Sequence, residues 1–122
     1  MIRLIKRRRA IRSYVFKLSQ ALPRRFGKKN FYRIEEVTKS AGGANLQMAF
    51  IAYAHAIFCS RADFEAYYEQ LGVRRTYDDL RATVSRRYFG GARDFDAARV
   101  IAATRRTNDG DYYESGIGDA GA

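Results

Sequence analysis

The sequence predicts an all-α fold, a single-domain bundle of five to six helices around a central apolar helix at about residues 45–59. Three observations predict it. The 122 residues are 47% hydrophobic and 30% charged, which is a globular composition, and the length suits one domain. Apolar residues recur at helical spacing without the alternation of a strand. The single proline, Pro23, leaves the rest of the chain free to be helical.

The first helix is expected over residues 2–22, where one narrow apolar stripe has Tyr14 at its edge. The stripe comprises Leu4, Ile11, Val15, Leu18 and Leu22. Pro23 is expected to end this helix because proline lacks the amide hydrogen that a helix interior needs. A basic connector follows over residues 23–33. The sequence leaves open whether this helix packs on the core, projects from it, or docks its stripe on a second copy.

Two helices are expected at the centre of the chain. Acidic Glu35 and Glu36 suit the first turn of a short helix over Ile34–Ala41, which the glycines at 42–43 are expected to end. The next helix is expected to start at residue 44 or 45 and to reach Cys59. Because it is apolar on every side, we expect it to have neighbours on several sides.

Capping signals predict three further helices. Ser60 and Thr76 each precede an acid by three residues, which predicts helices over residues 61–71 and 76–89. Asp94 is expected to cap a last helix over residues 95–106. The side chains expected to point inward are Phe64, Tyr67, Tyr68, Leu71, Tyr77, Leu80, Val84, Tyr88, Phe95, Ala98, Ile101 and Ala102. Residues 1–106 thus form one helical domain, and the acidic, Gly-rich residues 107–122 are predicted to be a disordered tail.

The segment Ala54–Tyr68, AHAIFCSRADFEAYY, is similar to one found in a family of small uncharacterised bacterial proteins. The resemblance covers about the middle half of the chain. It implies a bacterial, cytoplasmic origin and carries no function.

The charge of the chain is unevenly distributed. The net charge is +10, yet residues 1–29 alone hold eleven basic and no acidic residues. The remaining residues are therefore close to neutral. A field of one sign attracts polyanions or anionic membranes, so the basic segment is the predicted contact surface. Its candidate residues are Arg7, Arg8, Arg9, Arg12, Arg24, Arg25, Lys28, Lys29, Phe31 and Tyr32.

These residues lead us to expect a non-enzymatic binding or adaptor protein that meets a protein partner or a polyanion through its basic first helix and connector. The alternative is a nucleic-acid-binding protein that contacts phosphates with the same cations and stacks bases on the connector aromatics. An anionic membrane surface is a further alternative. In the remaining interpretation, the basic helix is solvated, its connector aromatics are buried, and the segment binds no partner.

Other patterns indicate little chemistry. His55 and Cys59 share a helix face, but each is the single residue of its type, so a buried histidine beside a buried thiol is the preferred interpretation. No pattern indicates a metal or another cofactor. The lone cysteine fits a cytoplasmic location. The apolar stretch of residues 46–59 is too short to span a membrane. The Arg-rich start of the chain, which lacks acidic residues, also resembles a mitochondrial transit peptide.

Overall fold

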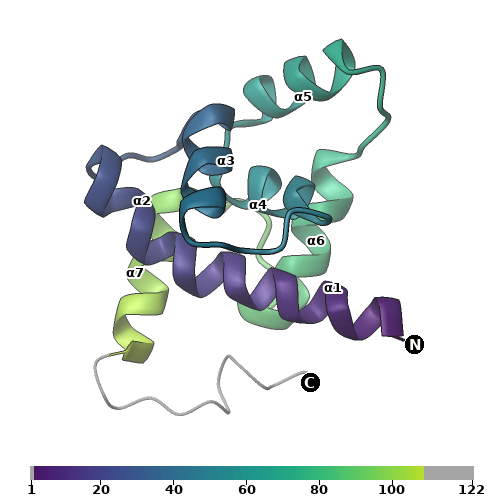
Figure 1. The fold of residues 1–122 in the computed structure, drawn as a ribbon. Coiled ribbons are helices and arrows are strands. Elements are labelled where there is room, and N and C mark those ends of the chain that lie inside the picture. Colours follow the sequence, from purple (N-terminus) through teal and green to yellow (C-terminus); the bar gives the residue numbers. More distant parts are fainter. Residues whose placement is uncertain (1, 109–122) are drawn as a thin grey trace.

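A central helix, α4 (Ile51–Phe58), contacts helices on several sides in the computed structural model, which describes residues 2–108 (Figure 1). Its neighbours are η1 (Tyr14–Leu18), α3 (Ile34–Gly43), α5 (Arg61–Gln70), α6 (Tyr77–Tyr88) and α7 (Ala97–Asn108). The described residues form six helices and no strand when the continuous helix at the start of the chain is counted once. The predicted all-α bundle is therefore confirmed.

The first helix is longer than predicted. It runs without a break through α1 (Ile2–Ser13), the π-helical turn η1 and α2 (Ser19–Phe26), and Pro23 lies inside it. The prediction that Pro23 ends the helix is wrong. A proline in a helix interior costs about 3 kcal/mol, but Leu18 and Leu22 just before it are fully buried, and this packing holds the segment helical.

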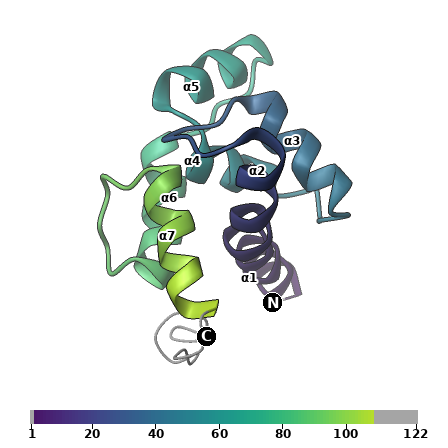
Figure 2. The same cartoon turned by 90° about the vertical axis from the view of Figure 1, so that its left-hand side faces the viewer.

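The long helix packs on the core from Ala10 onward, while its first turns extend past the core. Ile11, Tyr14 and Val15 are buried, whereas Ile2 is 67% and Ile5 50% exposed. Figure 2 shows α7 beside the second half of this helix, where it contacts η1 and α2. Within residues 2–108 no helix is long and apolar enough to cross a membrane.

The central helix begins later than the predicted residue 44 or 45. Asn45 has a φ of 61°, a left-handed conformation that asparagine tolerates better than most residues. The amide of Leu46 donates to the carbonyl of Ala41, and that of Asn45 donates to Gly42. These two bonds form a Schellman motif that ends α3 beyond the glycines and sends the chain outward before α4 starts at Ile51.

The buried carboxyl end of α4 receives its hydrogen-bond donors from distant segments. The carbonyl of Phe58 accepts from the amide of Tyr32 at 2.8 Å, and that of Cys59 accepts from the Tyr77 hydroxyl at 2.8 Å. The Arg81 guanidinium donates to the carbonyl of Ala56 at 2.9 Å. Because the last carbonyls of a helix have no intrahelical partner, these contacts allow α4 to end inside the protein.

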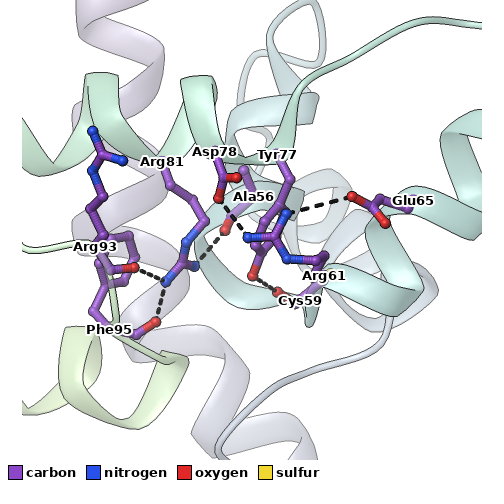
Figure 3. Close-up of polar contacts among 9 residues, drawn as sticks. All are labelled: Ala56, Cys59, Arg61, Glu65, Tyr77, Asp78, Arg81, Arg93 and Phe95. Atoms are coloured by element: carbon purple, nitrogen blue, oxygen red, sulfur yellow. Dashed lines mark hydrogen bonds and ion pairs between the residues drawn. The ribbon is translucent and has the colours of Figure 1, made fainter.

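Arg81 is a buried cation, 6% exposed, at the junction of α4, α6 and the loop before α7 (Figure 3). It also donates to the carbonyls of Arg93 and Phe95, and its guanidinium lies 3.8 Å from the centre of the Phe95 ring. Burial lowers the pKa of Arg81. Since no ion pair of Arg81 occurs in residues 2–108, backbone carbonyls and aromatic rings solvate this charge.

The predicted starts of α5 and α6 are confirmed. The Ser60 hydroxyl accepts from the Asp63 amide at 3.2 Å, while Thr76 occupies the corresponding position without a side-chain bond. Leu71 was expected to point inward but is 54% exposed. It lies beyond the last turn of α5, where the chain already turns toward Gly72.

The last helix starts two residues later than predicted and buries a partly different face, although Ile101 is buried as predicted. Asp96, not Asp94, accepts a hydrogen bond from the Arg99 amide at 2.9 Å. Phe95 is buried ahead of the helix, but Ala98 and Ala102 are exposed. The buried face consists of Ala97, Val100, Ile101 and Thr104. The helix extends to residue 108, inside the predicted tail, and the remainder of that tail, 109–122, lies outside the described residues.

We expect Asp96→Ala to lower the free energy of unfolding by about 1 kcal/mol, the usual cost of losing a helix cap. Asp94→Ala removes an equal charge two residues away and should change it by less than about 0.5 kcal/mol. Urea unfolding followed by circular dichroism measures both variants. An equal loss in the two would show that charge near this helix end, and not the cap, is responsible.

Candidate polyanion interface

The cations of the first 29 residues are almost all free of carboxylates. Within residues 2–108 one ion pair uses such a cation, Lys29 with Glu36 at 2.8 Å. Burial opposes the ionisation of Glu36, but hydrogen bonds from the Arg33 amide and from Lys29 outweigh it and lower the pKa of Glu36. Lys29 therefore has a structural role, and no carboxylate among residues 2–108 pairs with the other cations of this segment.

The candidate arginines of the long helix lie at its surface. Arg8, Arg9 and Arg12 are exposed on α1, as is the Arg24–Arg25 pair on α2. Three of these cations cover aromatic rings: Arg7 lies 6.0 Å from the Tyr53 ring centre, Arg12 5.2 Å from Phe16, and Arg25 5.8 Å from Phe26. The stems of Arg12 and Arg25 are thus held against the protein while their exposed charges face outward, whereas the Nε atom of Arg7 is buried.

The connector does not present the predicted aromatic surface. Tyr32 is 1% exposed, and its hydroxyl donates to the carbonyl of Gly27 at 2.6 Å, so its ring is unavailable for stacking. The reason is that the Tyr32 amide caps the end of α4. Phe26 is partly buried, and Phe31 is 39% exposed. Phe31 is the exposed aromatic residue of the connector, and it lies among exposed cations such as Lys28 and Arg33.

A hollow of about 260 Å³ is lined by residues of α1 and of the carboxyl-terminal part of α6. Four arginines face it, two from each helix: Arg7, Arg8, Arg86 and Arg87. Ile11, Thr83 and Tyr88 complete the lining, to which residues 2–108 contribute no carboxylate.

A second basic hollow, of about 570 Å³, is lined by residues of α2, of the segment after it and of α7. Arg24 and Lys28 line one side and Arg105 the other. Ser19 also lines it, is 2% exposed, and has a buried hydroxyl without a hydrogen-bond partner in residues 2–108. This hollow therefore combines three cations with a polar group that a bound anion or water would satisfy.

Arg86, Arg87 and Arg105 are the site residues that sequence reasoning missed. They occupy the last turns of α6 and α7, where a basic residue ordinarily complements the helix dipole. That interpretation accounts for their position along the helix. Their proximity to Arg7, Arg8 and Arg24 depends on how the helices cross, for which the sequence contains no signal.

His55 and Cys59 are buried in the core, where the ring of His55 is hydrogen-bonded and the thiol of Cys59 is protonated. The Thr38 hydroxyl donates to the carbonyl of Ile34, so it accepts from His55 Nε2–H at 2.8 Å, and the Tyr68 hydroxyl donates to His55 Nδ1 at 2.7 Å. Burial lowers the pKa of His55 to about 4. Burial also raises the pKa of the Cys59 thiol, which stays protonated. No group of three metal-ligating side chains occurs in residues 2–108.

The fold and these surfaces define a small all-helical protein with a basic face built on one long helix. The chain belongs to a family of unknown function, DUF6559, whose family profile matches residues 1–121. The predicted relation to an uncharacterised family is thereby confirmed. The comparisons with curated proteins and with solved structures gave no match.

Proposed function

We propose that this protein is a non-enzymatic binding module for nucleic acid, which it contacts through phosphates along the long helix and at the ends of α6 and α7. The observation that carries the proposal is the free state of the N-terminal cations, of which Lys29 alone forms an ion pair within residues 2–108. Gathering unpaired like charges is unfavourable unless an anion neutralises them. Phosphate groups supply such charge at regular spacing.

The layout of the cations favours phosphate contacts over base readout. The sixteen residue steps from Arg8 to Arg24 span about 24 Å of helix. At about 3.4 Å per base pair, that length corresponds to about seven base pairs of duplex. The connector offers Phe31 as its exposed aromatic ring, too little for a stacking platform. We therefore expect affinity that depends weakly on sequence and strongly on salt.

An acidic protein surface is the competing partner, and an anionic membrane is a second. Neither has a specific geometric feature in its favour comparable with the two arginine-lined hollows. The proposal includes a bacterial cytoplasmic location, supported by the lone, buried Cys59, which needs no oxidising compartment.

The test is a fluorescence anisotropy titration of labelled DNA and RNA, single-stranded and duplex, at several salt concentrations. We expect the logarithm of affinity to fall linearly with the logarithm of salt concentration. The double variant Arg8→Ala/Arg12→Ala should lower the slope by about 1 for each phosphate that it no longer neutralises. The control Arg74→Ala/Arg75→Ala removes equal charge from the exposed loop between α5 and α6, far from α1 in Figure 1.

Binding that is equally weakened in both double variants would reflect net charge alone and would contradict an interface on the long helix. Absence of binding to every oligonucleotide at low salt would remove nucleic acid as the partner. Anionic and neutral vesicles tested in parallel would reveal the membrane alternative.

A further inference from the structure

We propose that the hollow between α1 and α6 is a discrete site for a compact polyphosphate, the diphosphate or triphosphate group of a small molecule. This goes beyond the proposed function because a nucleic-acid backbone carries one negative charge per phosphate, spread along the strand. Four guanidinium groups around about 260 Å³ match a ligand whose charges are concentrated at one point.

The hollow has room for such a group. A water molecule in the liquid takes about 30 Å³, so this volume admits several waters or the phosphate groups that would displace them. Its lining combines the arginines with Ile11, 4% exposed, and Tyr88, 7% exposed. Apolar walls lower the local dielectric constant and strengthen the attraction between guanidinium and phosphate.

The donors that would hold the anion are uncommitted. Within residues 2–108, Arg8, Arg86 and Arg87 form no ion pair, and Arg7 Nε is buried without a hydrogen-bond partner. A guanidinium presents five N–H donors in a planar fork that fits two phosphate oxygens at once.

Four like charges around one hollow repel one another, and a bound anion would offset that repulsion. Two cations of α1 face two cations of α6, and no carboxylate from the described part of the chain lies in the lining between them. The dipole of α6 accounts for Arg86 and Arg87 but not for a second pair brought from another helix. A polyphosphate bridging the two pairs would convert this repulsion into attraction and tie α1 to α6.

The experiment titrates inorganic pyrophosphate, with sulfate at matched ionic strength as the reference anion, by calorimetry and by thermal unfolding. Pyrophosphate should bind the wild type and raise its Tm beyond the effect of sulfate, because a ligand that binds the folded state stabilises it. Arg86→Ala/Arg87→Ala should weaken binding at least tenfold. Arg8→Ala, on the opposite wall, should weaken it as well.

The matched control is Arg74→Ala/Arg75→Ala, which removes two exposed arginines from the loop between α5 and α6 and should retain pyrophosphate binding. Equal losses in the two double variants, or a pyrophosphate effect no larger than that of sulfate, would overturn the proposal. ADP identifies the source of the phosphate: affinity equal to that of pyrophosphate assigns recognition to phosphate alone, and tighter binding assigns a nucleotide. Pyrophosphate binding without oligonucleotide binding would leave this site standing and remove the proposed function.

Discussion

Replacing Arg81 with methionine is expected to lower the free energy of unfolding by about 3 kcal/mol. Methionine fills similar space but donates no hydrogen bond, so the buried carbonyls of Ala56 and Phe95 and the partly buried carbonyl of Arg93 would lose their donor. Each such carbonyl costs about 1–3 kcal/mol, partly offset because a cation no longer has to be buried. The variant would also lack the guanidinium that lies over the Phe95 ring.

Urea unfolding of the wild type and the variant measures this difference. Arg86→Met is the matched control, because Arg86 is exposed on the same helix and its replacement should change stability by less than about 0.5 kcal/mol. If the variant at position 81 were as stable as the control, the cost of burying the guanidinium would equal the stabilisation from its hydrogen bonds, which would contradict this prediction.

The second large effect is a loss of stability as pH falls from about 6.5 to about 4. His55 is neutral in the folded protein because burial lowers its pKa to about 4, whereas an unfolded chain would have a histidine pKa of about 6.5. Above pH 6.5 His55 is neutral in both the folded and the unfolded state, so it does not reduce the free energy of unfolding. Between the two values the unfolded state binds a proton that the folded state does not, so unfolding becomes easier by up to about 3 kcal/mol.

The chain holds one histidine, so its titration can be assigned without ambiguity. Nuclear magnetic resonance of the His55 ring in the folded protein should show a titration midpoint near pH 4. The free energy of unfolding should decrease as the pH is lowered from about 6.5 to about 4. His55→Gln should remove the pH dependence between about 6.5 and 4.5. A midpoint near 6.5 in the folded protein would contradict this account and would indicate that water reaches the ring.

Local signals in the sequence were sufficient to predict the positions of most of the helices. Ser60 caps α5 as predicted, and apolar periodicity placed Val15, Leu18 and Leu22 in the core. The signals failed where packing overrides local preference. Pro23 lies inside a helix because its neighbours are buried, and residues 46–50 leave the helical path because Asn45 adopts a left-handed conformation that ends α3.

The sequence by itself determined the helical class, the concentration of positive charge in the first 29 residues, and the absence there of any acidic residue to neutralise it. Tertiary structure alone decided that Tyr32 is buried, that Arg81 is solvated by carbonyls, and that Arg86 and Arg87 face Arg7 and Arg8. The physical reason is the range of the interactions. The apolar periodicity and capping residues that predict a helix can be recognised within a short stretch of sequence. The angle at which two helices cross depends on side chains from the whole core.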